Sequence, residues 1–168
     1  MAFIGMVVTT ALVTASDPTD PAPAFEALLI ANKSLDDGSG MRFINTSCQY
    51  FCNVCLSHVF EGSKHCSFCN RCVFGFDHHC RWVSNDIGSL NYVMFIRMLL
   101  FTLATLLIQI AFHSMLIDQL PSLDDVTESS SFLSIDESIA LCYAMLVFCV
   151  VLFLPLILLL GFHIYLIS

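Results

Sequence analysis

The sequence predicts an all-α membrane protein with several spans and a small cytosolic domain made of loops and β-hairpins. Hydrophobic residues make up 57% of the 168 residues and charged residues only 12%, with a mean hydropathy of +0.81. Such a chain has too little polar surface for a soluble globular protein. Apolar stretches lie near both ends and in the second half, and a segment rich in cysteine and histidine separates them. These observations together define the fold class.

Three apolar segments are candidates for membrane helices. Residues 1–16 are shorter than the ~20 residues that a span requires, and they lack the positive charges that begin a signal peptide. We interpret them as a partial transmembrane helix in a fragment that lacks the first helix, with a signal peptide as the weaker alternative. Residues 92–117 and 138–167 are long enough to span. Within the former, Gln109 and His113 share one helix face, which favours interhelical hydrogen bonding.

Polar segments connect these helices. Residues 17–47 are expected to form a cytosolic linker, in which prolines end the first helix, a short helix covers residues 24–33, and residues 36–40 make a turn. Residues 48–91 are the cysteine-rich domain, whose glycines and cysteine pairs indicate short hairpins. Residues 118–137 form an acidic lumenal or extracellular loop. No internal repeat is evident.

The charge distribution predicts the orientation. All six basic residues lie between residues 33 and 97, ahead of the uncharged stretch from Met98 to Ile117, and the 118–137 loop has none. The positive-inside rule places the cysteine-rich segment in the cytosol. Cytosolic thiols stay reduced, so metal binding is favoured over the alternative of a disulfide framework. The net charge of −8 argues against a nucleic-acid partner, because phosphate binding requires clustered Lys and Arg.

The cysteine-rich domain has the side chains and the spacing of a zinc-binding module. Each Cys-x-x-Cys turn can place two thiolates on one tetrahedral ion. So short a segment buries little core and needs metal or disulfides to hold it. Two tetrahedral sites need eight ligands, and nine candidates are present, so one cysteine can remain free. The candidates are Cys52, Cys55, His65, Cys66, Cys69, Cys72, His79, Cys80 and Asp86.

One run in this domain also has the composition of a nucleophilic site. Asp77, His78 and Cys80 place an acid, an imidazole and a thiol side by side. A free thiol of pKa ~8.5 is only a few per cent thiolate near neutral pH. A neighbouring imidazole can take its proton, and a carboxylate can hold that imidazole in the right tautomer. The alternative, evenly weighted from spacing alone, is that all of these residues are ligands or linkers of a structural zinc finger.

The pattern Cys-x2-Cys-x9-His-Cys-x2-Cys-x2-Cys-x4-Asp-His-His-Cys-x-Trp, followed by Asn91, Tyr92 and Phe95, resembles the cysteine-rich domain of DHHC-type protein S-acyltransferases. The resemblance covers residues 52–95, and Asp17-Pro18 is similar to a further motif of the family. It implies that Cys80 is the acylated nucleophile, His78 its base and Asp77 the orienting acid, with Trp82 beside the acyl chain. It also implies two structural zinc sites. Their ligands would be Cys52, Cys55, His65 and Cys72 in the first, and Cys66, Cys69, His79 and Asp86 in the second.

The resemblance further implies transfer of a palmitoyl group from palmitoyl-CoA to cysteines of cytosolic or membrane proteins, next to the membrane lipid. The expected location is an endomembrane (Golgi or ER) or the plasma membrane.

The sequence departs from the family pattern at Asp86, where a cysteine is usual. Carboxylate oxygen can ligate zinc but is a harder ligand than thiolate. We also expect the chain, which ends at Ser168, to be a fragment without the first helix and the C-terminal motif of the family. These departures leave open a second function, that of a non-catalytic membrane adaptor whose zinc domain only binds partners.

Overall fold

A computed structural model describes residues 1–31, 39–48, 50–123 and 135–167. The chain divides into two compact units. One comprises Met1–Val7 and Ile96–Ser168, and the other comprises Val8–Phe95. The first unit contains most of the long helices, and the second contains the cysteine-rich domain.

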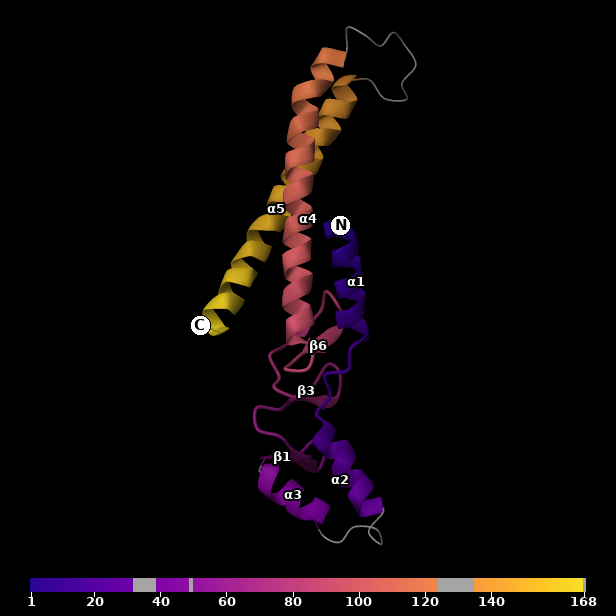
Figure 1. The fold of residues 1–168 in the computed structure, drawn as a ribbon, viewed down its shortest axis with the longest axis vertical. Coiled ribbons are helices and arrows are strands. Elements are labelled where there is room, and N and C mark those ends of the chain that lie inside the picture. The colour runs from indigo at the N-terminus through magenta and orange to yellow at the C-terminus, as the bar shows by residue number, and fades with distance from the viewer. Residues whose placement is uncertain (32–38, 49, 124–134, 168) are drawn as a thin grey trace. The chain divides into compact units, whose positions relative to one another are not determined.

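Two long helices dominate the first unit (Figure 1). Helix α4 spans Tyr92–Gln119 and helix α5 spans Ile135–Ile167, and both are long and apolar enough to cross a membrane. A short 3-10 turn, η1, covers Leu120–Leu123. The acidic loop expected at residues 118–137 overlaps the ends of these elements, and its central part lies outside the described residues.

Polar and small side chains mark the contacts within this unit. The Sγ of Cys149 in α5 donates to the side-chain oxygen of Gln109 in α4 at 3.5 Å, so the interhelical role expected for Gln109 is confirmed. His113 instead bonds within its own helix, to the carbonyl of Gln109 at 2.7 Å. Gly5 faces the ring of Phe101 so closely that a Cβ there would lie 2.6 Å from it. Small residues permit such close helix approach in membrane proteins.

The second unit begins with three helices. Helix α1 spans Ala2–Ala15 and its end enters this unit, α2 spans Pro21–Ala31, and α3 spans Ser39–Ser47. Helix α2 starts earlier than expected because Asp20 caps it, accepting the amide of Ala22 at 2.8 Å. Helix α3 was not expected at all. The turn predicted at residues 36–40 overlaps it at Ser39 and Gly40, and residues 36–38 lie outside the described range.

A small hydrophobic core joins α2 and α3 to the first hairpin. Its buried members are Ala22, Ile44 and Cys48, with Leu29 and Phe60 packed against them. Asp20 adds a polar link, since its second carboxylate oxygen accepts the amide of Phe60 at 2.9 Å.

Three antiparallel hairpins follow, each a separate two-stranded sheet. Hairpin 1 pairs β1 (Tyr50–Cys52) with β2 (Ser57–Val59). Hairpin 2 pairs β3 (Lys64–Cys66) with β4 (Arg71–Val73), and hairpin 3 pairs β5 (His78–Cys80) with β6 (Asn85–Ile87).

The hairpins repeat along the chain, contrary to the expectation of no repeat. Their first strands start at residues 50, 64 and 78, a constant spacing of fourteen residues. The central cross-strand pairs keep the same spacing and are Phe51 with His58, His65 with Cys72, and His79 with Asp86. The three sheets share no strand pairing, and backbone bonds such as Phe76 N–H to Gly62 O at 3.2 Å and Ser89 N–H to Phe74 O at 2.9 Å link the segments beside them.

Candidate metal centres and nucleophile

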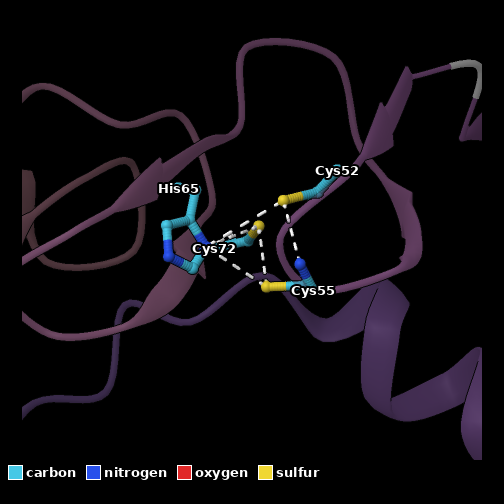
Figure 2. Close-up of side chains that lie close together, drawn as sticks. All are labelled: Cys52, Cys55, His65 and Cys72. Carbon is cyan, nitrogen blue, oxygen red and sulfur yellow. Dashed lines mark hydrogen bonds between the residues drawn. The ribbon is translucent and has the colours of Figure 1, made fainter.

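The first cluster joins hairpin 1 to hairpin 2. The turn between β1 and β2 supplies Cys52 and Cys55, and the central pair of hairpin 2 supplies His65 and Cys72. Figure 2 shows the three sulfurs and the imidazole pointing toward one another. The Nδ1 of His65 lies 3.9, 3.3 and 3.9 Å from the sulfurs of Cys52, Cys55 and Cys72. The sulfurs of Cys55 and Cys72 are 3.5 Å apart.

The second cluster joins hairpin 2 to hairpin 3 by the same rule. The turn between β3 and β4 supplies Cys66 and Cys69, and the central pair of hairpin 3 supplies His79 and Asp86. The Nδ1 of His79 lies 3.8 and 3.5 Å from the two sulfurs and 2.8 Å from Oδ1 of Asp86. The Asp86 side chain is fully buried.

The donor sets fit a tetrahedral zinc ion. Two sulfurs that each lie ~2.3 Å from zinc are about 3.8 Å apart, close to the spacing found here and far longer than a disulfide bond. All cysteines of the two clusters are free thiols. Burial raises the pKa of Cys69 to about 11 and raises that of Cys72 further. A bound ion would therefore have to displace protons from these thiols.

Among the eight residues of the two clusters, Asp86 is a carboxylate and the other seven are cysteines and histidines. Burial alone would raise its pKa, but hydrogen bonds from Cys66, His79, Cys69 and Arg71 together lower it to about 2. The buried group is therefore an anion, and it can offer a charged oxygen to a cation. Carboxylate is an accepted zinc ligand beside cysteine and histidine.

Cys80 is the last residue of β5 and is buried. Among the described residues, it belongs to neither of the two clusters. His78, two residues earlier on the same strand face, connects it to Asp77. The Nδ1 of His78 lies 2.9 Å from Oδ2 of Asp77, and its ring packs edge-on against Phe95 with centroids 5.3 Å apart. The acid, imidazole and thiol thus form a contiguous set outside the two candidate metal clusters.

The surroundings of Cys80 and His78 shift the pKa values of these two residues in opposite directions. Burial alone would raise the pKa of Cys80, but hydrogen bonds from His78 and from the backbone of Val83 and Trp82 outweigh it and lower the pKa. Hydrogen bonding to Cys80, followed by that to Asp77, raises the pKa of His78 against the opposing effect of burial. The two shifts favour a thiolate beside an imidazolium, which is the activated form of a nucleophilic cysteine.

Aromatic side chains surround the turn that follows Cys80. Trp82 is almost entirely exposed, at 94%. Phe68 stacks on the His79 ring with centroids 4.8 Å apart, and the guanidinium of Arg81 lies 5.6 Å above the Phe68 ring. Cys80 is therefore next to an exposed apolar and cationic surface.

A family model, described as DHHC palmitoyltransferase, matches residues 45–168, most of the chain and all of the site. The chain belongs to the DHHC palmitoyltransferase family. Among curated DHHC proteins, palmitoyltransferase ZDHHC17 of Danio rerio is 51% identical over 53 residues, which are 32% of this chain and 8% of that protein. Palmitoyltransferase AKR1 of Mortierella alpina is 50% identical over 48 residues, 29% of this chain and 9% of that protein. Probable protein S-acyltransferase 6 of Arabidopsis thaliana is 33% identical over 91 residues, 54% of this chain and 22% of that protein.

Sequence reasoning missed the polar residues that support the site of this DHHC protein. Arg71, the first residue of β4, donates to Asp86 Oδ2 at 3.2 Å, to Asn85 Oδ1 at 2.6 Å and to Asp17 Oδ1 at 3.1 Å. Asn85 in turn donates to the carbonyls of Val13 and Ser16, each at 2.8 Å, at the end of α1. These contacts join residues far apart in sequence, so no local sequence motif predicts them.

His58 lies in β2, at the centre of hairpin 1. Its amide and its Nδ1 both contact the carboxylate of Glu26 in α2, each at 2.8 Å. Among the described residues, no metal-binding turn precedes hairpin 1, and its histidine contacts Glu26 of α2 instead.

Proposed function

We propose that this chain carries the catalytic centre of a protein S-palmitoyltransferase, with Cys80 as the residue that becomes acylated. The observation that carries the proposal is the separation of Cys80 from the two clusters while His78 and Asp77 remain beside it. A cysteine confined to a structural role would gain nothing from an oriented imidazole. The family match and the names of the relatives support the same activity.

The reaction would proceed in two transfers. The Cys80 thiolate attacks the thioester carbonyl of palmitoyl-CoA, an S–acyl bond forms, and the bond to the CoA sulfur breaks. His78, which holds the proton from Cys80, gives it to the departing CoA thiolate. A cysteine of the protein substrate then loses its proton to His78 and attacks the acyl group on Cys80. The acyl group passes to that cysteine, and the Cys80 thiolate is regenerated. Asp77 keeps the imidazole oriented through both transfers.

Each of the two clusters would hold one structural zinc ion. The first would use Cys52, Cys55, His65 and Cys72, and the second would use Cys66, Cys69, His79 and Asp86. Four protein ligands leave no open position for substrate, so zinc would supply rigidity and no Lewis-acid chemistry. This role suits hairpins that share no strand pairing with one another.

The surroundings of Cys80 would suit a donor with a long acyl chain. Helices α4 and α5 would anchor the chain in the membrane, with the hairpins on the cytosolic side as the distribution of basic residues favours. Exposed Trp82 would contact the acyl chain near the lipid. Substrate proteins would then present cysteines close to the membrane surface, on an endomembrane of the Golgi or ER or on the plasma membrane.

Acyl transfer to the chain itself tests the proposal. The purified protein in detergent, incubated with labelled palmitoyl-CoA, should acquire about one label per chain that hydroxylamine releases. Cys80→Ser should abolish the label. Cys48→Ser is the matched control, because Cys48 is a buried free thiol outside both clusters, and it should keep the label. Absence of label on the unaltered protein would refute the enzymatic function.

A second candidate function is a non-catalytic membrane adaptor that only binds partners through its metal domain. Asp86 at a ligand position favours this alternative, because a carboxylate departs from the usual cysteine of the family. A protein that retains two zinc ions, binds partners and takes no label would support it.

A further inference from the structure

The turn that carries Cys80 repeats the backbone of the two metal-binding turns. Cys52, Cys66 and Cys80 each end a first strand, and each pairs with the first residue of the following strand. The residue just before that following strand has a positive φ in all three turns. Residues other than glycine rarely adopt this conformation, so its recurrence at one place indicates one turn type. These residues are Leu56, Asn70 and Ser84, with φ of 52°, 51° and 48°.

The likeness extends to the backbone donors around the first sulfur of the turn. The Sγ of Cys52 accepts the amide of Cys55 at 3.3 Å and is also hydrogen-bonded by the backbone of Val54. The Sγ of Cys80 is hydrogen-bonded by the backbone of Val83 and Trp82. Val83 and Trp82 stand at the places of Cys55 and Val54. The third turn thus surrounds the Cys80 sulfur with the same donors as a predicted metal ligand.

The third turn differs in its second side chain. Where the first two turns have a cysteine, the third has Val83, which is 4% exposed. Each of the first two turns also receives two ligands from the central pair of the next hairpin. After hairpin 3 the chain enters helix α4 instead, so no further pair follows. The third turn therefore has a single sulfur and lacks the other donors of a cluster.

We propose that Val83 determines the chemistry of Cys80: by occupying the place of the second cysteine, it keeps the first sulfur of a metal-binding turn free to act as a nucleophile. The inference deepens the proposed function and rests on it for the role of Cys80. Its structural part, that the turn needs only one more thiol to bind a soft ion, stands on the geometry alone. Cysteine behaves as a small apolar residue when buried, so Val83→Cys suits the existing space.

Phenylarsine oxide is a suitable probe, because its arsenic(III) bonds to two adjacent thiols. Two S–H bonds are replaced by two As–S bonds, the oxide leaves as one water molecule, and no electron is transferred. The full chain in detergent would be loaded with zinc, and zinc release would be monitored so that uptake by the two clusters is recognised. We expect Val83→Cys to take up one arsenical per chain without releasing zinc. We expect its labelling by palmitoyl-CoA to fall at least tenfold in the presence of the arsenical and to return when a dithiol removes it.

Two control variants isolate the second thiol. Val83→Ser differs from Val83→Cys only by an oxygen in place of the sulfur; it should take up no arsenical and keep both zinc ions, and its labelling should not change when the arsenical is added. Val83→Cys combined with Cys80→Ser should also take up none, because a single thiol remains in the turn. The unaltered protein should behave like Val83→Ser.

Two results would overturn the inference. Zinc-loaded Val83→Cys that takes up no arsenical would show that the third turn does not have the geometry of a metal-binding pair. A fall in the labelling of zinc-loaded Val83→Ser when the arsenical is added, without release of zinc, would show that the effect does not depend on a second thiol in the turn. Failure of the proposed function would look different from failure of this inference. It would leave the unaltered protein without label, whereas uptake of the arsenical by Val83→Cys would still report on the geometry of the turn.

Discussion

Replacing Arg71 by methionine should weaken metal binding in the second cluster alone. The carboxylate of Asp86 is divided between two partners, with Oδ1 2.8 Å from the His79 ring and Oδ2 3.2 Å from the Arg71 guanidinium. Because Arg71 occupies Oδ2, only Oδ1 remains to face the two sulfurs and the imidazole. Methionine is similar in length and apolar, but it would leave Oδ2 buried without its donor.

The magnitude follows from the burial of the two ion pairs that Arg71 makes. Removing a partner that orients a metal ligand typically costs 10–100-fold in metal affinity, or about 1.4–2.7 kcal/mol. Asp86 is fully buried, so Arg71→Met should show the full effect. The other partner, Asp17, is 75% exposed, and exposed pairs contribute only about 0–1 kcal/mol. Asp17→Asn is therefore the matched control and should change the affinity less than fivefold.

Cobalt(II) provides the assay, because its absorption reports on each thiolate ligand and its loss to a chelator gives the affinity. The unaltered protein should hold two ions, and Arg71→Met should release one of them at a chelator concentration 10–100 times lower. Adding Asp86→Cys to Arg71→Met should restore retention, since a thiolate ligand has one donor atom and needs no partner to orient it. Equal weakening of both ions, or no rescue by Asp86→Cys, would refute this account of Arg71.

Three further outcomes follow from contacts in the second unit. Asn85→Ala should lower the free energy of unfolding by about 3 kcal/mol, because it removes the donor for two backbone carbonyls at the end of α1 and the acceptor for a buried amide; thermal denaturation in detergent measures this. Hydrogen bonds from Thr19 hold the pKa of Asp17 below its ordinary value, so Thr19→Val should raise that pKa in an NMR titration. Glu26→Ala should speed hydrogen exchange at the amide of His58 about 10–100-fold, because that amide donates to a carboxylate.

Each outcome has a result that would contradict it. Asn53 is exposed in the first turn. An equal loss of stability in Asn53→Ala would show that the loss in Asn85→Ala does not come from the hydrogen bonds of Asn85. For Asp17 the sign is defined: a lowered pKa stabilises the folded state above the ordinary value near 3.8, and this contribution disappears as the pH falls through the lowered pKa. A stability difference between the unaltered protein and Thr19→Val that grew in acid would therefore be inconsistent. Unchanged exchange at His58 would mean that Glu26 does not protect it.

The grouping of the candidate metal ligands came from the resemblance to the family, and the local spacing of these residues is consistent with it. Cys-x-x-Cys pairs must form turns, and a histidine just before a cysteine on a strand points to the opposite face from it. Thus His65 and Cys66 fall into different clusters, as the structure has them. Extended apolar runs identified α4 and α5 for a similar reason, since length and composition alone decide whether a helix can span.

Contacts between distant segments were not accessible in this way. Arg71 was counted only as a basic residue for orientation, yet it bonds to Asp17, 54 residues earlier. Helix α3 escaped notice because its sequence is polar and contains Gly40, and part of its stability comes from packing of Ile44 against α2 and Phe60. The hairpin repeat was overlooked because few positions recur: besides the cysteines, Val59-Phe60 and His65 return as Val73-Phe74 and His79, while most residues between them differ. Equal intervals between Cys52, Cys66 and Cys80 were the available signal.

The order of the ligands along the chain has a consequence for biosynthesis. All donors of the first cluster precede Asp77, and the second cluster is completed by Asp86, just ahead of helix α4. A nascent chain leaving the ribosome would therefore release a full set of donors for one ion before the last donor for the other emerges. Metal loading would then proceed from the N-terminal side, with each closed hairpin presenting its turn to the next hairpin as that hairpin emerges.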